Sequence, residues 1–490
     1  MPDMQASELT PYAPKANQGT FTIPLDLVGG NKFGRYKKVS VEQTFNMMVS
    51  DDALVDYAGY SFILELTNNP DAEGRGIFSS IKNNIMIAVV SDGVFSINHN
   101  LIPSPIGSLD TSVGEVYISE NNAGQIALSD GVNIYIYTPI SGAFETATIS
   151  FIPGFLSFQD TRFICASVGT SQWQLSASNN GLSWPNDTQT VGLLETKPDS
   201  VQAVVPMPGK GTTALVFGNT VTENWVDTGA ALFPYQRQNS FNIDYGCINP
   251  SSIAYQGNFI VWIGVSEEAG PVVMYTEGNN LVEVSTDGID YVLGLLKNPE
   301  DCSGFLVKVD GHLFYQFTFK SDNITYLYDF TTKLFFTVTD ENLNYHIARK
   351  IVYFNNTYYF VSFNDGNLYE FGTQFSSYQY QNTDAEIPRI RITSPKRLTS
   401  QRPMIYKSLS FTIEQGEDNP NNNMAVDLSM SRDGGVNFGQ ALRQYMNPTG
   451  VRRSRFIYQR LGRANDMSVK LRFIGQNRFT VFNGEIEAFL

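Results

Sequence analysis

Short apolar runs, each ended by a polar turn, follow one another along the middle of the chain. Residues 85–90 (IMIAVV) and 94–97 (VFSI) flank a Ser-Asp-Gly turn, and residues 125–128 and 132–137 flank a second one. Asp-Gly favours a two-residue hairpin turn because both central positions need a positive φ. The pattern therefore predicts a series of antiparallel hairpins from residue 61 onward.

The hairpin unit recurs through residue 386, with further turns expected around 180–181, 218–219, 256–258, 310–311 and 355–366. About seven units at a spacing of roughly 40 to 55 residues, each with about four strands, are typical of a β-propeller. One four-stranded sheet cannot bury both faces alone, whereas sheets packed around an axis can. Trp-Asp and kelch signatures are missing, so six or seven blades are both compatible with the pattern, and a stack of β-sandwiches is the competing architecture.

The pattern changes after Pro388, where the predicted strands become longer. Residues 407–414, 425–431 and 468–474 alternate strictly between apolar and polar positions. This period of two is typical of an antiparallel sheet with one solvated face. We therefore predict a C-terminal β-sandwich over residues 387–490.

The first sixty residues are predicted to form an irregular arm. Pro11, Pro14 and Pro24 interrupt regular elements, and Gly29-Gly30 marks a turn. A basic patch (Lys32, Arg35, Lys37, Lys38) follows, as a solvated surface or as a contact to a neighbouring chain. The expected domains are thus an arm (1–60), a propeller (61–386) and a sandwich (387–490).

Composition supports an all-β fold with large cores, because 13% of the residues are aromatic and only 17% are charged. Cys165, Cys247 and Cys302 lie far apart, so we expect buried free thiols in a chain made in a reducing cytoplasm. No stretch reaches the roughly 20 apolar residues of a membrane helix. The start of the sequence lacks the pattern of a signal peptide.

The net charge of −15 is divided unevenly along the chain. Residues 387–490 carry a net charge of +8, and the preceding residues carry −23. An acidic body should repel nucleic acid, because phosphate binding needs clustered cations. The basic domain could face either phosphates or an acidic protein surface.

Candidate chemistry is sparse. The three histidines (His99, His312, His346) are not spaced as metal ligands, and residues 208–213 (PGKGTT) lack the first glycine and the helix of a phosphate loop. We therefore expect no enzymatic activity, no cofactor and no metal site.

Two segments are similar to the Asp-box hairpin of sialidases. One contains Asp433, Gly435 and Phe438, and the other, residues 177–184, has Asn179 in place of the acid. The carboxylate of such a box caps backbone N–H groups while the aromatic ring packs beneath, so we interpret it as a structural turn.

The densest basic cluster is made of Arg452, Arg453, Arg455, Arg460 and Arg463. It lacks the interleaved aromatic residues of a nucleic-acid surface. A protein–protein contact, or arginines packed between strands, is the favoured interpretation.

The C-terminal motifs, residues 429–438 (SMSRDGGVNF), 456–463 (FIYQRLGR) and 469–472 (VKLR), resemble the packaged-DNA stabilisation proteins of short-tailed bacteriophages, also called tail accessory or tail nozzle proteins. Residues 160–163 and 233–247 are similar to mid-chain segments of that family. The arm departs from it, with Ala58-Gly59 where a Pro-Gly is expected.

The resemblance implies a structural virion protein that acts in the tail and is synthesised in the host cytoplasm. It implies a hexameric ring below the portal and its adaptor ring, where a head-to-tail connector retains the packaged DNA and conducts it at ejection. Tail fibre or tailspike proteins and tail-tip proteins would be further partners, and double-stranded DNA would pass without sequence-specific binding. The alternative function, suggested by the Asp-box segments, is a glycan-binding or sialidase-like propeller.

Overall fold

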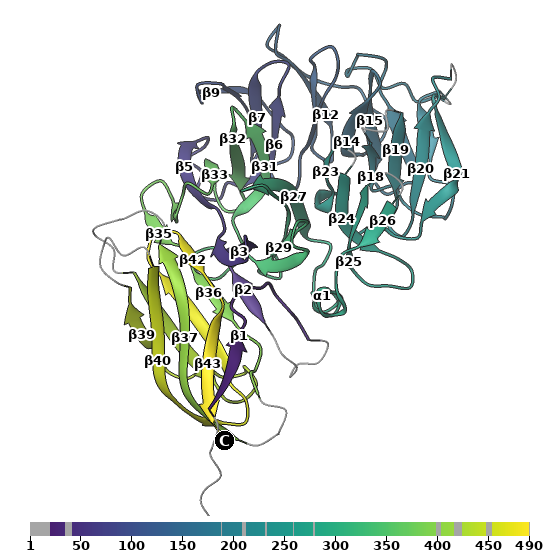
Figure 1. The fold of residues 1–490 in the computed structure, drawn as a ribbon. Helices are drawn as coiled ribbons and strands as arrows, with labels where there is room; N and C mark the ends of the chain where they lie inside the picture. Colours follow the sequence, from purple (N-terminus) through teal and green to yellow (C-terminus); the bar gives the residue numbers. More distant parts are fainter. Residues whose placement is uncertain are drawn as a thin grey trace, which may run out of the picture.

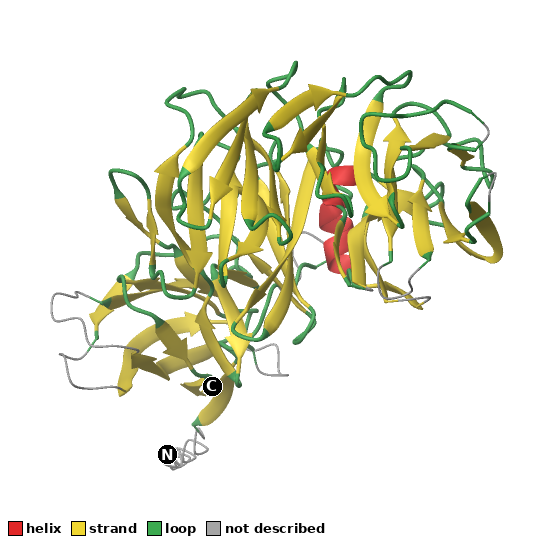
Figure 2. Cartoon of the chain, turned by 90° about the horizontal axis from the view of Figure 1, so that it is seen from above, coloured by secondary structure: helices red, strands yellow, loops and turns green. Residues whose placement is uncertain are grey.

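The computed structural model describes residues 20–34, 42–187, 189–207, 212–230, 233–257, 259–277, 280–397, 403–415, 424–446 and 453–489. These residues form two bodies, a propeller and a sandwich, that lie side by side (Figure 1). Strands predominate in both (Figure 2), and the described residues contain a single α-helix, α1 (Asp287–Leu293). The all-β prediction is confirmed.

The propeller has seven blades within the described residues, so the larger of the two predicted blade numbers is found. The strands of the first three blades are β6 (Gly74–Ser80), β7 (Ile85–Val90), β8 (Gly93–Asn98) and β9 (Pro103–Ser108); β10 (Tyr117–Glu120), β11 (Ile126–Ser129), β12 (Ile134–Thr138) and β13 (Ala143–Thr146); and β14 (Pro153–Gln159), β15 (Arg162–Ser167), β16 (Gln172–Leu175) and β17 (Val191–Leu193).

The fourth and fifth blades are β18 (Ala203–Pro206), β19 (Thr213–Phe217), β20 (Thr222–Asp227) and β21 (Tyr235–Ile243); and β22 (Gly246–Cys247), β23 (Ala254–Gln256), β24 (Phe259–Val265), β25 (Val272–Glu277) and β26 (Asn280–Glu283), with a 3-10 turn η2 (Pro250–Ser252). The sixth contains β27 (Cys302–Val309), β28 (His312–Phe319), β29 (Ile324–Asp329) and β30 (Leu334–Thr337). The seventh contains β31 (Ala348–Phe354), β32 (Thr357–Ser362) and β33 (Asn367–Gly372).

A strand from the N-terminal part of the chain completes the seventh blade. β5 (Gly59–Glu65) pairs antiparallel with β33, and the small hairpin of β34 (Ser377–Gln379) and β35 (Asp384–Glu386) extends the same sheet. The inner strands β31 and β6 then pack together and close the ring. The ring is therefore fastened by a pairing between segments about three hundred residues apart in sequence.

The predicted hairpins form, but only some of their turns have the predicted backbone conformation: at the β7–β8 turn Ser91 has a positive φ whereas Asp92 and Gly93 do not, and at residues 130–131 only Gly131 does. At the β27–β28 turn, Asp310 and Gly311 both have positive φ, 46° and 88°. Two successive positive φ values match the right-handed twist of the flanking strands, which explains the Asp-Gly sequence there.

The sandwich consists of two sheets. One contains β1 (Phe21–Leu25), β43 (Gly484–Phe489), β37 (Met404–Gln415), β42 (Phe479–Val481), β4 (Ala53–Asp56), β3 (Met47–Ser50) and β40 (Arg453–Ala464). The other contains β2 (Gln43–Phe45), β36 (Arg389–Ile392), β41 (Ser468–Ile474), β38 (Ala425–Ser431) and β39 (Leu442–Tyr445). The alternation predicted for β41 is confirmed, since its apolar residues are buried while Arg472 is exposed.

The N-terminal segment differs from the irregular arm that its prolines predicted. Within residues 20–34 and 42–60, β1 to β4 join the sandwich, and Leu25, Leu27 and Leu54 lie in its core. β2 pairs with both β30 of the sixth blade and β36 of the sandwich, so one sheet runs through both bodies. The strands are short and interrupted, which is why local patterning did not reveal them. Pro11, Pro14, Arg35, Lys37 and Lys38 lie outside the described residues.

Candidate functional site: buried ion networks and an exposed basic strand

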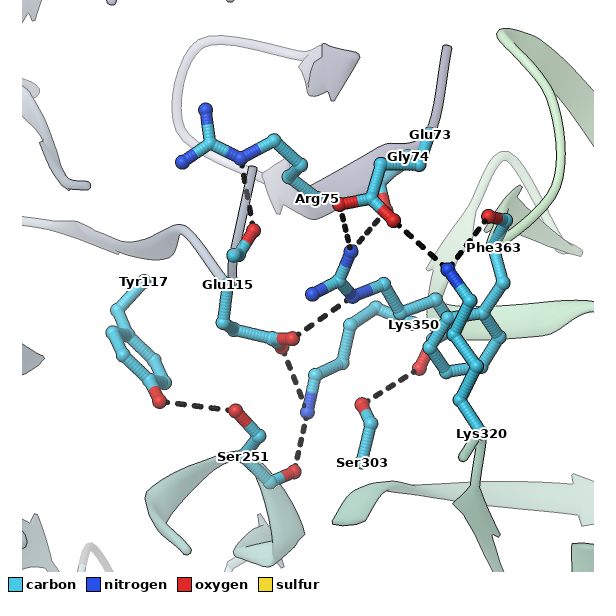
Figure 3. A network of polar contacts seen from close by, with 12 residues as sticks. Glu73, Gly74, Arg75, Glu115, Tyr117, Ser251, Ser303, Lys320, Lys350 and Phe363 are labelled. Carbon is cyan, nitrogen blue, oxygen red and sulfur yellow. Dashed lines mark hydrogen bonds and ion pairs between the residues drawn. The ribbon is translucent and has the colours of Figure 1, made fainter. Parts of the chain in front are cut away.

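Charged side chains from several blades meet where the inner strands converge (Figure 3). Arg349 on β31 lies 3.1 Å from Glu115 (Nε to Oε2) and 3.5 Å from Glu73 (Nη1 to Oε1). Lys350 lies 3.1 Å from the other oxygen of Glu115, and Lys320 lies 3.1 Å from Glu73. We call these five residues the axial network.

Backbone carbonyls complete the coordination of the cations in the axial network. Lys350 Nζ donates to the carbonyls of Ser251 (2.7 Å) and Gly304 (2.9 Å), and Arg349 Nη1 donates to that of Gly74 (3.0 Å). Glu73 and Glu115 directly precede β6 and β10, Ser251 belongs to η2, and Gly304 belongs to β27. The network therefore ties the first, second, fifth, sixth and seventh blades together.

The axial network is most deeply buried at its centre, whereas the Lys320 side chain is 37% exposed. The side chains of Arg349 and Glu115 are only 10% and 8% exposed. Burial alone would raise the pKa of Glu73, but the neighbouring Arg349 and Lys320 hold it below its usual value. Each carboxylate of the axial network has two cationic partners, and such a network braces the fold, because removing Arg349 would leave each glutamate with a single lysine in a largely buried site.

A second pair of ion contacts joins the N-terminal strands to the sandwich. Arg389 Nε lies 2.9 Å from Asp56 Oδ1, and Arg391 Nη2 lies 2.8 Å from Glu42 Oε2; both arginine side chains are fully buried. Burial raises the pKa of Asp56, and Arg389 offsets part of that rise. Sequence reasoning missed these pairs because their members lie more than 300 residues apart. The one feature of the sequence that pointed toward these pairs was the uneven distribution of charge along the chain.

The predicted arginine cluster lies on β40, apart from Arg452, which is outside the described residues. Arg453, Arg455, Arg460 and Arg463 are all exposed, so none of them is packed between strands. Arg453 pairs with Glu414 on β37, and Arg455 lies 3.5 Å from Glu485 on β43.

β40 presents its basic residues on one face only. Ser454, Phe456 and Tyr458 are buried on the opposite face, as a period of two requires. Lys407 on β37 adds a further exposed pair with Glu487 (2.9 Å). Cations and carboxylates thus alternate on the outer face of this sheet, and we call that face the β40 face.

The predicted structural turn surrounds Asp433. Asp433 Oδ1 accepts hydrogen bonds from the backbone N–H groups of Val436 (3.1 Å) and Asn437 (3.0 Å) and from the Ser431 hydroxyl (2.6 Å). These hydrogen bonds hold the pKa of Asp433 far below its usual value. Gly435 has a φ of 88°, and Phe438 lies beside Lys470, whose Nζ is 6.0 Å from the ring centroid.

The related segment at residues 177–184 also closes on itself. The Trp184 indole donates to the carbonyl of Gly181 at 2.7 Å, and its ring is buried between blades two and three. Asn180 Oδ1 accepts from the backbone N–H of Leu182 at 3.1 Å. In this segment Asn180, and not Asn179, supplies the capping oxygen, and the Gly181 N–H donates to Gln125 of the second blade, so the hairpin is also fastened to its neighbour.

The histidines and cysteines are engaged in the fold. His312 Nδ1 lies 2.8 Å from Asp329, His346 is buried with a pKa lowered to about 3, and the His99 carbonyl accepts from Asn355. The three cysteines are free and buried, and burial raises their thiol pKa values, to about 12 for Cys165 and Cys247.

The part of the chain that the structure describes also lacks two other kinds of site. Among the residues of that part, no group of three His, Cys, Asp or Glu side chains is placed to hold a metal ion. None of the helices found there is long and apolar enough to cross a membrane.

The propeller shares a sheet with the sandwich, and the buried charges of both bodies pair with one another. These features define a structural protein built from β-sheets. Residues 46–376 match the family model of the bacteriophage P22 Gp10 β-propeller, and residues 391–488 match that of the Gp10 β-sandwich. The chain therefore belongs to the bacteriophage P22 Gp10 family of phage stabilisation proteins, which are components of the virion. The predicted family, propeller and C-terminal sandwich are confirmed.

Solved structures show distant likeness to the propeller. A catalytically inactive virginiamycin B lyase from Staphylococcus aureus is 11% identical over 64% of this chain and 98% of its own, with a TM-score of 0.44. The N-terminal domain of Nup159 is 10% identical over 67% of this chain and 98% of its own, with a TM-score of 0.42. Such likeness concerns the fold and not the activity. None of the curated proteins matches the chain.

Proposed function

We propose that copies of this chain form a closed ring, six-fold in symmetry, in the phage tail below the portal and its adaptor ring. The ring retains packaged DNA and conducts it at ejection. The observation that carries this proposal is the match of both domains to one phage stabilisation family. Ring contacts between identical subunits would be heterologous and would have to close.

The connection between the two bodies supports a load-bearing role. A single sheet runs from the sixth blade through β2 into the sandwich, and the buried pairs Arg389–Asp56 and Arg391–Glu42 flank it. β2 and β30 pair at Phe45 and Thr337, and bending there would break the hydrogen bonds that Asn31 and Asn46 make with residues 335–339 of the sixth blade, each of which contributes roughly 1 kcal/mol. A subunit of this kind would transmit the pressure of packaged DNA without bending at its domain junction.

Charge supports passage of DNA through the ring. The residues before 387 carry a net charge of −23, and an acidic wall would repel phosphates and let the duplex slide. The basic excess of the C-terminal domain is partly neutralised inside the chain, because Arg389 and Arg391 pair with acids from the N-terminal segment. The exposed arginines of β40 remain for contacts with neighbouring tail proteins, such as the adaptor ring, the tail fibre or tailspike, or the tail tip.

The glycan-active alternative is not supported by the positions of the propeller arginines. A sialidase-like site would need arginines free to bind a carboxylate, but Arg75, Arg162, Arg237 and Arg349 all bond to other groups of the fold. Exposing host surface polysaccharide to the purified protein should release no sugar.

The test is to complement a phage lacking this gene product. Particles made without the protein should package DNA and then lose it, and wild-type protein added to purified heads should restore retention. Electron microscopy of the restored particles should show a six-fold ring below the adaptor. Retention of DNA in its absence, or binding of a single copy per portal, would contradict the proposal.

A further inference from the structure

Three neighbouring cavities lie in a row on the side of the propeller that faces the sandwich, and we call this row the trough; the ion pair of Arg478 with Asp310 (3.2 Å) separates the second cavity from the third. The first, about 280 Å³, lies between the inner strands β23, β27 and β31. It shares Tyr353 and Tyr358 with a second cavity of about 180 Å³, which shares Asp310 with a third of about 430 Å³. The third is also lined by Thr480 of β42, so the trough runs from the propeller axis to the sandwich.

Tyrosines line the axial end of the trough. Tyr255 and Tyr353 are 42% and 54% exposed, whereas most aromatic residues that the structure describes are buried or half-buried. The rings of Tyr353 and Tyr358 are 5.0 Å apart, and the Tyr358 hydroxyl accepts from the backbone N–H of Lys308, which fixes that ring across the trough. Gln256 and Asn356 add exposed side-chain amides at the same end.

This surface has the features that recognise a polyproline II segment. Such a helix has three residues per turn and leaves its carbonyls free to accept hydrogen bonds. It docks by placing prolines between aromatic rings in a groove. The exposed tyrosines would supply the rings, and the amides of Gln256 and Asn356 would supply donors.

The chain itself contains a segment of the required kind. Residues 11–14 read Pro-Tyr-Ala-Pro, a P-x-x-P spacing that places both prolines on one side of a polyproline II helix. They precede the described part of the chain, which starts at residue 20. No other P-x-x-P occurs in residues 1–34.

The segment is too short to reach the tyrosines of its own subunit. β1 starts beside Ala488, at the end of the sandwich remote from the propeller (Figure 1), and Ala488 pairs with Tyr406. From Tyr406 to Glu414, which is level with Thr480 and the third cavity, β37 spans about 27 Å. Pro14 precedes Phe21 by seven residues and extends at most about 25 Å. Tyr353 and Tyr358 line the first and second cavities, which lie further from β1 than the third cavity does.

We propose that the trough of each subunit binds the Pro11–Pro14 segment of a neighbouring copy. In a ring, every subunit would then hold the arm of the next, and the contact would form only on assembly. The proposal rests on the proposed ring for the source of the segment, whereas the binding capacity of the trough can be tested without a ring.

The first experiment measures binding of a fluorescein-labelled peptide of residues 1–19 to the full chain by fluorescence anisotropy. We expect saturable binding that weakens at least about tenfold with Tyr353→Ala and with a Pro11→Ala/Pro14→Ala peptide, as for an aromatic hot spot. Ile81→Ala, at an exposed turn of the first blade, is the matched control and should leave binding unchanged. Absence of binding, equal binding to Tyr353→Ala, or binding of host polysaccharide in place of the peptide would overturn the proposal.

The second experiment places the segment within the assembled tail. Tyr12→Cys combined with Lys308→Cys should give disulfide-linked chains larger than a monomer, since the native cysteines are buried. Tyr12→Cys combined with Ile81→Cys should not. A disulfide formed within one chain would contradict binding of the segment to a neighbouring copy. Peptide binding without any ring in the virion would instead refute the proposed function and leave the trough as a binding site.

Discussion

The axial network of the propeller and the β40 face of the sandwich place their ion pairs in opposite environments. Arg349 and Glu115 lie at the propeller axis with side chains 10% and 8% exposed, whereas Arg453 and Glu414 lie on the β40 face with side chains 68% and 36% exposed. A buried pair resists removal of one partner because the other charge remains desolvated. An exposed pair is weak, because water and salt compete with it. The same residue types therefore brace the propeller but leave the sandwich face available for a partner.

The largest expected effect is the loss of a buried cation. Arg349→Ala removes the cation that Glu73 and Glu115 share and leaves each with a single lysine, so the free energy of unfolding should fall by about 3 kcal/mol, the lower end of the range for a broken buried pair. Urea denaturation followed by tryptophan fluorescence measures this change. A loss below about 1 kcal/mol would mean that the axial network contributes no more to stability than an exposed ion pair does.

The second prediction concerns acid, again within the propeller. His346 has a pKa lowered to about 3 by burial, whereas an unfolded histidine takes up its proton near pH 6.5. The unfolded state therefore binds more protons between these values, and stability falls as the pH drops from about 6.5 toward 3. His346→Asn retains an acceptor for the Ala348 N–H and should show a shallower decline over that window.

The matched measurement is the unfolding free energy of both proteins at pH 7, 5 and 4. Comparing how the unfolding free energy of each protein changes with pH removes the pH-independent loss of stability that the substitution causes. Equal slopes would mean that His346 is protonated in the folded state.

The third prediction tests the turn of the sandwich. Asp433→Ala strands the N–H groups of Val436 and Asn437 at an exposed loop and should lower the melting temperature by less than Arg349→Ala does. Calorimetry gives the shift, with Asp433→Asn as a control that retains an acceptor. Loss of a glycan-directed activity with an unchanged melting temperature would instead make the turn a functional site.

The smallest effect on stability is expected on the β40 face. Replacing Arg452, Arg453 and Arg455 with Glu should change the unfolding free energy by no more than about 1 kcal/mol. Incorporation into tails should nevertheless fail, and wild-type incorporation should weaken as salt rises, because exposed charges are screened beyond about 10 Å at 0.1 M salt. Normal assembly of this variant, together with lost DNA binding, would identify the face as a nucleic-acid contact.

Local patterning was sufficient for the repeated hairpins and for the sandwich strands. The hairpins and the alternation of β41 depend on neighbours within a few residues, and both appear where the sequence predicts them. The bonding of Asp433 is equally local, because its backbone partners lie three and four residues away. The same local reasoning failed for residues 21–56, whose strands are only three to five residues long and include Pro24.

The sequence by itself thus determined the hairpins of the propeller, the strands after Pro388, the family and the division into a propeller and a sandwich. Only the tertiary structure decided that β5 closes the ring, that β2 joins the two bodies, and that Arg389 and Arg391 neutralise acids from the N-terminal segment. The physical reason is that the entropy of closing a loop grows only with the logarithm of its length. A strand therefore pairs almost as readily with a partner three hundred residues away as with a nearer one, and burial and hydrogen bonding in three dimensions make the choice.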